Sequence, residues 1–188
     1  MPRTTPVKHG LSVRLATEPW EFEAIHRLNH DTFAGEIPQH PADPSGRLVD
    51  PFHAENTYLI ALRGRELAGM LAVRGNRPFS LDHKLPNLDS YLPTGRSCCE
   101  VRLLAVARAY RRGRVLLRLL TALWEYATAQ GFDAAVVSAT TRQLRMYSRL
   151  GFVPFGPLVG RPEAQFQPMF VTRERAAAAF ARLGSGRR

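Results

Sequence analysis

The sequence predicts an α/β or α+β fold with a mixed central sheet. Three observations carry this prediction. A strongly apolar strand at 98–106 is followed by the clearest amphipathic helix of the chain, at 114–130, and by a buried strand at 134–138; two strands joined through a helix imply a crossover unit. A strand–turn–strand pattern at 57–74 predicts a hairpin before it. The 188 residues are 45% apolar and 22% charged, as in a soluble protein with one core.

The first third of the chain alternates between ordered patterns and proline-bearing segments. Residues 1–10 are expected to be a flexible leader, and the apolar–polar alternation of 11–15 predicts a half-buried strand. Thr-Glu-Pro at 17–19 is a helix start signal, and apolar spacing predicts a helix over 18–33. Residues 34–56 predict a long loop, and loops of that length are often functional.

The remaining elements follow from apolar runs and their glycine stops. The hairpin consists of strands at 57–62 and 66–74, joined by a turn at 63–65. Residues 75–96 are polar and proline-bearing, with leucines that indicate one or two short helices. Further along we expect a helix at 142–150, strands at 152–155 and 168–172, a terminal helix at 176–183 and a basic tail at 184–188. One domain is therefore expected over 11–183.

The cysteines and histidines indicate neither a disulfide nor a metal site. Cys98 and Cys99 are adjacent, and neighbouring strand residues point to opposite faces, so a bridge between them would be strained. His26 and His30 have the i, i+4 spacing of a metal-binding pair, but no third ligand has a matching spacing. We predict two reduced cysteines and no metal.

The charge predicts an anionic partner. Lys and Arg total 26 against 16 Asp and Glu, a net charge of +10, which attracts nucleic acid, an anionic membrane face, a phosphate-rich cofactor or an acidic carrier protein. The arginines are scattered without aromatic interleaving or a recognition-helix pattern, which disfavours nucleic acid. No apolar run approaches the roughly 20 residues that span a bilayer, and residues 1–10 have no apolar signal region. We expect a cytoplasmic protein without a membrane span.

The strand-to-helix segment 106–120 is the first candidate for chemistry. The N-terminus of a helix offers unpaired N–H groups and positive dipole charge, both of which suit phosphate. Arg111, Arg112 and Arg114 add charge at the same point. The segment is therefore either a pyrophosphate site or a solvated basic loop before an ordinary helix.

Two segments resemble the signatures of GNAT (GCN5-related N-acetyltransferase-like) acyltransferases. Residues 106–120 resemble the family's pyrophosphate loop, and Tyr147, Gly151 and Phe152 resemble its Tyr-x-x-x-Gly-Phe ending. The resemblance implies the GNAT fold, a mixed sheet flanked by helices, and a thioester co-substrate, acyl-CoA or acyl carrier protein (acyl-ACP), without a metal. A strand bulge near 104–106 would free backbone N–H groups for the donor. The expected donor-binding residues are Leu104, Ala105, Val106, Arg111, Arg112, Gly113, Arg114 and Val115.

The segment 106–120 departs from the family's pyrophosphate-loop pattern at two positions. Val115 and Leu117 stand where the family has glycines, which permit close backbone approach to phosphate. The chain is more similar to the branch of N-acyl-homoserine-lactone synthases and N-acyl amino acid synthases, which use long acyl thioesters, often on acyl carrier protein. Four stretches carry that similarity: Glu100-Val-Arg102 with the strand after it, Arg27 with Phe33, Asp50-Pro-Phe-His53, and Gly69 with Arg74.

The implied chemistry assigns roles to two residues. An amine must lose a proton and attack a thioester carbonyl, the oxyanion needs a donor, and the departing thiolate needs a proton. Glu100 is expected to be the base, directly or through water; the alternative is an ion pair with Arg102, which lies on the same face of the strand. Tyr147 is expected to protonate the sulfur, as the resemblance implies; the alternative is a core tyrosine.

The remaining candidates concern the substrate. Arg74 and Arg102 are expected either to bind a substrate carboxylate or to form salt bridges. Arg27 and Phe33 are substrate-binding by resemblance. Phe79, with Leu81, Leu85 and Leu88, lines an acyl tunnel or belongs to the core. Asp50 and His53 either contact an amine or stabilise their loop.

The sequence thus favours an N-acyltransferase that moves an acyl group from acyl-CoA or acyl-ACP, of medium or long chain, to the amine of a small molecule such as an amino acid. Alternatives are an acetyl-CoA-dependent GNAT N-acetyltransferase, a non-catalytic acyl-ligand-binding GNAT-like domain and a basic nucleic-acid-binding module. Acyl carrier protein is acidic as a class and suits the basic cluster around 108–118. Exposed strand edges in this fold allow two copies of the chain to pair, so a homodimer is a further possibility.

Overall fold

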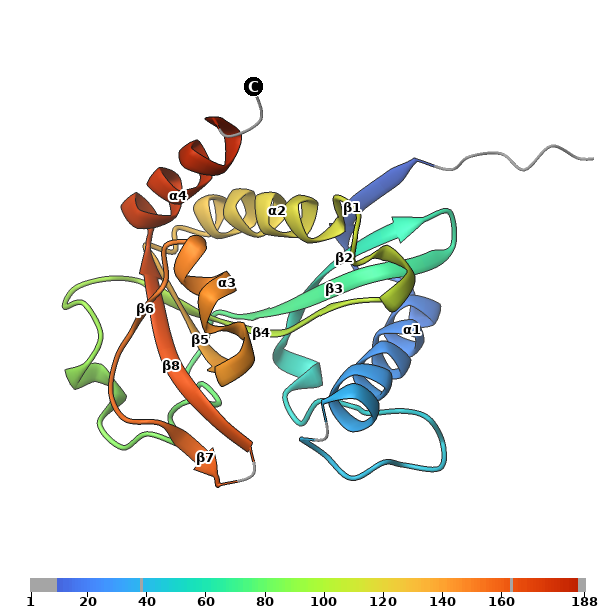
Figure 1. Ribbon diagram of the computed structural model, residues 1–188, viewed down its shortest axis with the longest axis horizontal. Coiled ribbons are helices and arrows are strands. Elements are labelled where there is room, and N and C mark those ends of the chain that lie inside the picture. The colour runs from blue at the N-terminus through green and yellow to red at the C-terminus, as the bar shows by residue number, and fades with distance from the viewer. Residues whose placement is uncertain (1–9, 38, 163, 186–188) are drawn as a thin grey trace, which may run out of the picture. The chain divides into compact units, whose positions relative to one another are not determined.

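The computed structural model describes residues 10–37, 39–162 and 164–185 (Figure 1). The chain groups into two compact units. The first unit takes the chain up to Ala72 together with Leu103–Trp124, and the second takes Val73–Arg102 together with the chain from Glu125 onward. Each unit is described by itself. The expected leader and the last three residues of the expected tail lie outside the described residues, apart from Gly10.

The strands of the described chain form an eight-stranded mixed sheet, which confirms the predicted fold class. The strand order is β1-β2-β3-β4-β5-β8-β6, and β7 pairs with β8. β1 runs antiparallel to β2, β4 runs parallel to β5, and β8 runs antiparallel to β5. The parallel pair is the crossover unit that the strand–helix–strand pattern predicts, because parallel neighbours cannot be joined by a tight turn.

Three elements have residues in both units: β3 (Glu66–Arg74), β4 (Cys98–Val106) and α2 (Val115–Ala129). The other elements of the first unit are β1 (Leu11–Leu15), α1 (Pro19–His30), the π-helical turn η1 (Asp31–Glu36), the 3-10 turn η2 (His53–Glu55), β2 (Thr57–Arg63) and the 3-10 turn η4 (Arg108–Tyr110). The predicted strands and hairpin are confirmed. The predicted helix over 18–33 ends as an α-helix at His30, and the π-helical turn continues it into the predicted loop.

Helix α1 begins where the sequence signal places it. Pro19 is its first residue, Glu18 is the N-cap, and Glu18 and Glu21 form a reciprocal capping box. The Glu21 carboxylate is fully buried and also binds Arg14 of β1. A buried carboxylate needs such donors, so this pair ties the start of α1 to the first strand.

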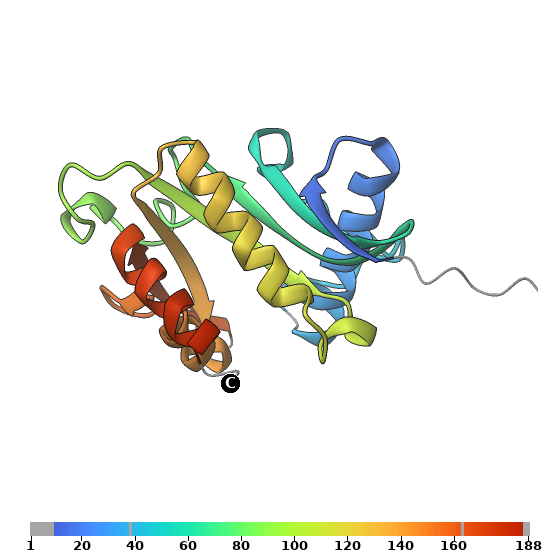
Figure 2. The ribbon, with the colours of Figure 1, turned by 90° about the horizontal axis from the view of Figure 1, so that it is seen from above.

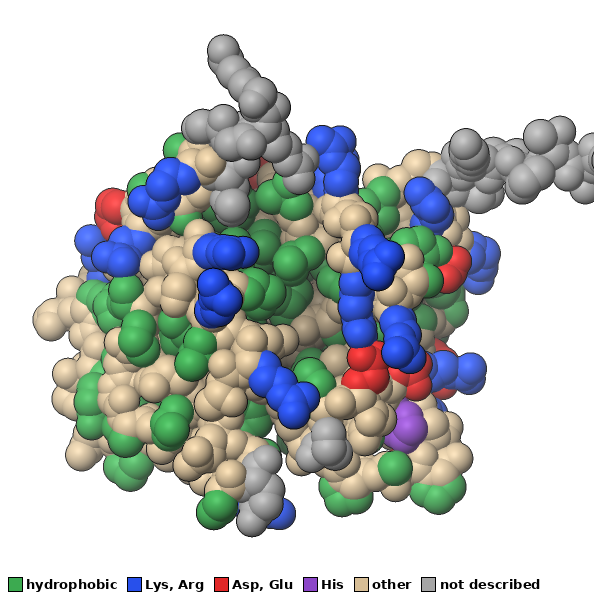
Figure 3. Space-filling view, viewed as in Figure 1, with side chains coloured by type: hydrophobic (Ala, Val, Ile, Leu, Met, Phe, Trp, Pro, Cys, Tyr) green, Lys and Arg blue, Asp and Glu red, His purple; other side chains and the backbone are tan. Residues whose placement is uncertain are grey.

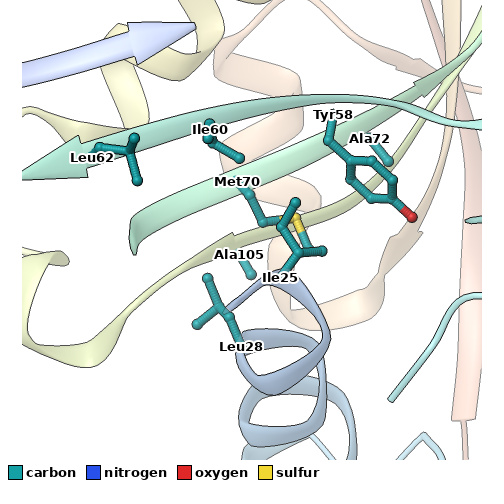
Figure 4. Packing of buried hydrophobic residues seen from close by; sticks show 8 residues of the cluster. All are labelled: Ile25, Leu28, Tyr58, Ile60, Leu62, Met70, Ala72 and Ala105. Atoms are coloured by element: carbon teal, nitrogen blue, oxygen red, sulfur yellow. The ribbon is translucent and has the colours of Figure 1, made fainter. Parts of the chain in front are cut away.

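The core of the first unit lies between α1 and one face of the sheet. Ile25 and Leu28 of α1 point toward side chains from β2, β3 and the end of β4 (Figure 4). The buried members are Ile25, Leu28, Tyr58, Ile60, Leu62, Met70, Ala72 and Ala105. Tyr58, Ile60 and Leu62 alternate along β2, as expected of a strand with one face on this helix.

Helix α2 approaches the opposite face of β3 at Gly69. A Cβ at Gly69 would lie 2.9 Å from Val115 Cγ1 and 3.0 Å from the Ala105 carbonyl oxygen. Successive strand residues point to opposite faces, so Met70 faces α1 while Gly69 faces α2. Figure 1 shows α1 and the start of α2 on opposite sides of β2 and β3. Glycine at 69 is therefore what lets α2 lie against the strand.

The second unit is built on a long antiparallel pair. Ala134–Thr140 (β5) is in register with Phe166 to Thr172 of β8 (Ala164–Thr172). The remaining elements are η3 (Leu88–Ser90), η5 (Thr141–Gln143), α3 (Leu144–Arg149), β6 (Val153–Pro154), β7 (Val159–Arg161) and α4 (Arg173–Ser185). Figure 2 shows α4 running alongside β5 in the view from above.

One short 3-10 helix, η3, forms in 75–96, as the leucine pattern predicts. The second unit differs from the sequence prediction at two other places. Strand β7, which has three residues including Gly160 at φ 101°, carries too little apolar pattern to be recognised. The terminal helix begins at Arg173 and reaches Ser185, so the first two residues of the predicted tail are helical.

Replacing Gly69 by alanine is expected to destabilise the protein by about 1–3 kcal/mol, because the added methyl overpacks the contact with Val115 and Ala105. Chemical denaturation measures the change. A second substitution, Val115→Ala, removes the nearest atom and should restore part of the loss in the Gly69→Ala background. Equal unfolding free energies for wild type and Gly69→Ala would contradict the close approach.

Candidate functional site

The end of strand β4 has an irregular backbone. Leu103 adopts a left-handed φ of 53°, which a bulky residue rarely adopts. Such a residue interrupts the regular ladder and re-aims the N–H groups that follow it. The sequence places a bulge near 104–106, and the structure has the irregularity one residue earlier. The backbone of Leu104, Ala105 and Val106 follows it directly, in the first unit.

The N-terminus of α2 comes one short loop later. The helix begins at Val115, and its first turn closes with the bond from Arg118 N to Arg114 O, at 3.0 Å. The N–H groups before that bond are the groups that bind phosphate at helix starts. Arg112, Gly113 and Arg114 precede the helix and are all exposed. The loop and the helix start therefore offer the charge and donors that a phosphate needs.

Arg111 is engaged inside the first unit. Its two terminal nitrogens bind the Glu36 carboxylate at 2.6 and 2.8 Å, and Nε donates to the Val106 carbonyl at 3.0 Å. The hydrogen bond from Arg111 lowers the pKa of Glu36. This geometry differs from the phosphate-binding role expected for Arg111, because the guanidinium is already neutralised by a carboxylate.

Ion pairing separates structural arginines from those that face outward. Basic side chains outnumber acidic ones on the face shown in Figure 3. Several arginines have carboxylate partners, including Arg14, Arg77, Arg96, Arg111 and Arg173. Within the described residues, no ion pair engages Arg112, Arg114 or Arg118. The start of α2 therefore carries arginines whose charge is available to an external anion.

The side chain of Val115 does not crowd the loop, contrary to the expectation from its replacement of a glycine. It is 3% exposed and faces Gly69 of β3. Leu117 is half-buried on the same helix. Because helical side chains point away from the axis and the N–H groups run along it, Val115 keeps its backbone N–H for a ligand while its side chain serves packing.

Arg27 and Phe33 have different surroundings. Arg27 is on the exposed face of α1 and forms an i, i+4 ion pair with Glu23 at 3.0 Å. Phe33, in the π-helical turn, is half-buried and packs against the core of the first unit. The structure therefore gives each residue a local partner, and their role in substrate binding stays a prediction.

Asp50 and His53 belong to a hydrogen-bonded loop in the first unit. Asn56 donates to Asp50 Oδ2 at 2.7 Å and to the Tyr58 hydroxyl at 3.2 Å. His53 Nδ1 is 3.1 Å from the same hydroxyl, and its ring stacks edge-on with His26 at 4.7 Å between centroids. Burial, followed by the neighbouring His53, lowers the pKa of His26. These contacts favour the loop-stabilising role for both residues.

Glu100 is a buried carboxylate of the second unit with several hydrogen-bond partners. It is 1% exposed and accepts three hydrogen bonds from the 80–81 segment: Ser80 Oγ at 2.6 Å, Ser80 N at 2.8 Å and Leu81 N at 3.2 Å. Arg102 Nη1 lies 3.5 Å from its Oε2. A carboxylate has about four acceptor positions; residues 80–81 fill three of them, and Arg102 adds an ion pair without a hydrogen bond. The ion pair with Arg102 is therefore present, together with an anchor for residues 80–81.

Arg74 is also engaged within the second unit. It is 2% exposed, and its Nε donates to the Asn76 carbonyl at 3.1 Å. Arg102 keeps 14% of its side chain exposed. Both arginines therefore have structural partners. Recognition of a substrate carboxylate by either of them stays a prediction.

Tyr147 lies on α3 with its ring edge-on to Phe152, 5.3 Å between centroids. It is 7% exposed, and burial raises the pKa of its hydroxyl to about 12. Gly151, at φ 93°, ends this helix and packs where a Cβ would meet the Arg175 carbonyl oxygen. The tyrosine–glycine–phenylalanine motif thus places a neutral hydroxyl at the end of a short helix.

Phe79 is a core residue of the second unit. It packs in an apolar cluster whose buried members are Phe79, Leu81, Leu85, Leu88, Val136 and Val159. It also lines a cavity of about 360 Å³ with Leu92 and Cys98, and Arg77 and Arg96 stand at its polar side. The residues that the sequence offers as an acyl tunnel are thus buried core, and Phe79 also lines this cavity.

The cysteines are not bridged, and the described residues contain neither a metal-ligand cluster nor a membrane-spanning helix. Cys98 and Cys99 are free, and burial raises the pKa of Cys99 to about 12. Within residues 10–37, 39–162 and 164–185, no three His, Cys, Asp or Glu side chains gather as metal ligands. Across the same ranges, no helix combines the length and apolarity that crossing a bilayer requires.

Sequence reasoning missed Glu36 and Ser80. Each is a single polar residue in an irregular segment, and its partner is 75 or 20 residues away. Such pairs leave no periodic signal. For Glu36, the net positive charge was a signal, because some arginines of a basic loop usually pair with carboxylates in the folded protein.

Comparison with known proteins places this geometry in a family. Residues 24–172 match the family model described as N-acyl amino acid synthase FeeM. The isovaleryl-homoserine lactone synthase of Bradyrhizobium diazoefficiens is 31% identical over 142 residues, which are 70% of this chain. The match spans 63% of that synthase.

Two solved structures share the architecture. A CoA-dependent acyl-homoserine lactone synthase, BjaI, solved with MTA, is 26% identical with a TM-score of 0.71, covering 94% of this chain and 90% of that one. FeeM, an N-acyl amino acid synthase from uncultured soil microbes, has a TM-score of 0.72 at 17% identity, covering 91% and 95%; at that identity the likeness supports the fold alone. The fold is that of GNAT-like acyltransferases, and the chain belongs to the N-acyl amino acid synthase FeeM family.

Proposed function

We propose that this protein is an N-acyltransferase that moves an acyl group from a phosphopantetheine thioester, carried on CoA or acyl carrier protein, to the amine of a small molecule such as an amino acid. The observation that carries the proposal is the start of α2, where exposed Arg112 and Arg114 adjoin helix N–H groups directly after the irregular end of β4. Family membership supports the same reaction class.

The donor proposal rests on phosphate chemistry. Both CoA and the prosthetic group of acyl carrier protein contain phosphate, and a helix N-terminus with flanking arginines binds that group through N–H donors and charge. The relative BjaI is CoA-dependent, which supports CoA as a donor. The basic residues at the start of α2, with Arg108 and Arg118, also suit an acidic carrier protein, so both donors belong in the test.

The chemical step divides among backbone and side-chain groups. The amine attacks the thioester carbonyl and its proton passes to solvent water, the tetrahedral oxyanion needs N–H donors, and the C–S bond breaks as the thiolate leaves. We assign the oxyanion donors to the backbone that follows Leu103, because a left-handed residue re-aims the next N–H groups. Tyr147 is protonated at neutral pH, since its pKa is about 12, and can give a proton to the departing sulfur.

Glu100 is assigned a positioning role. Ser80 and Leu81 donate three hydrogen bonds to its carboxylate, and Arg102 forms an ion pair with it. An incoming ammonium would compete with these partners if Glu100 took its proton, directly or through water. We propose that Glu100 fixes residues 80–81 next to Phe79.

Release of free thiol tests the function. We expect the purified protein to release thiol from acyl-CoA or acyl-ACP only when an amine from a mixed amino acid pool is present, with rates that depend on acyl length. A set of acetyl, medium-chain and long-chain donors, each on CoA and on carrier protein, identifies the donor class. Tyr147→Phe should lower kcat by about tenfold or more, because the thiolate then leaves unprotonated.

Absence of thiol release with every donor and amine would contradict the acyltransferase proposal. Unchanged turnover in Tyr147→Phe would remove only the assigned role of the tyrosine. Tyr126→Phe, on helix α2, is the matched control for loss of a hydroxyl outside the proposed site.

Glu100→Gln separates a positioning role from a base. The variant places an amide N–H₂ against hydrogen-bond donors and removes the charge that faces Arg102, so we expect a loss of about 3 kcal/mol in unfolding free energy. Denaturation and turnover are measured on the same preparations. Wild-type stability combined with turnover lowered more than about tenfold would indicate a base instead.

A further inference from the structure

Arg111 and Glu36 form a contact that the donor role of the loop does not explain. The donor loop, residues 107–114, joins β4 to α2 in the first unit. Glu36 is the last residue of the π-helical turn η1, 75 residues earlier in the chain. Both carboxylate oxygens bind the guanidinium, at 2.6 and 2.8 Å. A two-bond contact of this kind fixes orientation as well as distance.

The third contact of Arg111 closes the loop on itself. Its Nε donates to the carbonyl of Val106, the last residue of β4, at 3.0 Å. Three N–H groups of one rigid planar group are therefore committed, one to the strand and two to the π-helical turn. The guanidinium faces the protein's own backbone and carboxylate, while Arg112 and Arg114 beside it are exposed.

Two further hydrogen bonds hold the donor loop against β3. Ala107 N donates to the Ala68 carbonyl at 2.9 Å, and the Tyr110 hydroxyl donates to Glu66 Oε2 at 2.6 Å. The donor loop is thus held by β3 on one side and by η1 on the other. All of these residues belong to the first unit.

We propose that Arg111 and Glu36 are positioning residues, which hold the donor loop in the shape that presents Arg112, Arg114 and the first N–H groups of α2 to the donor's phosphate. The inference rests on the proposed function and deepens it by assigning Arg111 a role other than phosphate ligand. Arg112, Arg114 and the first N–H groups of α2 must face the phosphate together, so donor affinity depends on the loop being held in the binding shape beforehand.

If Arg111 were instead a phosphate ligand, removing the Glu36 charge would change donor affinity in the opposite direction. If Arg111 bound phosphate itself, Glu36 would compete with the donor for the guanidinium. Removing the Glu36 charge would then strengthen donor binding, while removing Arg111 would weaken it. If the pair positions the loop, removing either partner weakens donor binding. The direction of the Glu36→Gln effect therefore decides between the two.

The experiment measures KM and kcat for the acyl-CoA donor in Glu36→Gln, Arg111→Gln, Arg111→Lys and the double variant Glu36→Gln/Arg111→Gln. We expect each single variant to raise the donor KM about two- to fivefold, as for a partly exposed ion pair, with kcat little changed. The double variant should be no worse than the worse single one, because both changes break one contact. Arg111→Lys should resemble Arg111→Gln, since lysine keeps the charge but lacks the fork.

A lower donor KM in Glu36→Gln, or a wild-type KM in both single variants, would overturn the proposal. Glu174→Gln is the matched control, because it breaks the Arg96–Glu174 pair of 2.9 Å in the second unit and should leave donor KM unchanged.

Amide hydrogen exchange without any donor keeps this test separate from the proposed function. The N–H groups of Tyr110 and Gly113 bond to Ala107 O at 2.8 Å and Tyr110 O at 3.1 Å within the donor loop. Glu36→Gln and Arg111→Gln should exchange these amides faster, and Glu174→Gln should not. Unchanged exchange in both loop variants would overturn the positioning role even if acyl transfer is confirmed. Faster exchange without detectable acyl transfer would support the positioning role and reject the function.

Discussion

The close approach of α2 to β3 at Gly69 is the constraint from which the first unit follows. A side chain at 69 would collide with Val115 and with the Ala105 carbonyl, so the helix can start where it does only because glycine is there. Val115 is consequently buried, and the residue that departs from the glycine pattern becomes a packing residue of the helix start. The donor loop before it must then gain its shape from contacts to β3 and to Glu36.

In the second unit, one buried carboxylate, Glu100, holds an irregular segment in place. Glu100 is nearly inaccessible and binds Ser80, Leu81 and Arg102, so a single charge on β4 organises the irregular segment that carries Phe79. A buried carboxylate this well supplied with donors is costly to remove. Its burial on a strand is therefore explained by structure before any catalytic role is invoked.

The sequence predicts the local elements better than the site. Alternating or helical apolar spacing identifies β1 to β5 and α2, and Glu18-Pro19 marks the start of α1, because these signals come from neighbouring residues. The ion pair of Glu100 with Arg102 can also be predicted from the sequence, since the two lie two residues apart on one strand. The Glu36–Arg111 and Ser80–Glu100 contacts cannot be predicted in this way, because they involve irregular segments far apart in the chain from their partners. The motif Tyr147, Gly151, Phe152 predicts the GNAT fold, and stretches such as Glu100-Val-Arg102 predict the synthase branch, which the match over residues 24–172 confirms.

The central claim is that the start of α2 binds the donor through its phosphate. Its most direct test compares kcat/KM for one acyl group carried on CoA, on 4′-phosphopantetheine and on pantetheine. The account predicts a fall along that series, with the step to pantetheine costing about ten- to a hundredfold, as for loss of charge-assisted hydrogen bonds, and expressed mainly in KM. Equal kcat/KM values for the three donors, at low and high salt, would contradict it.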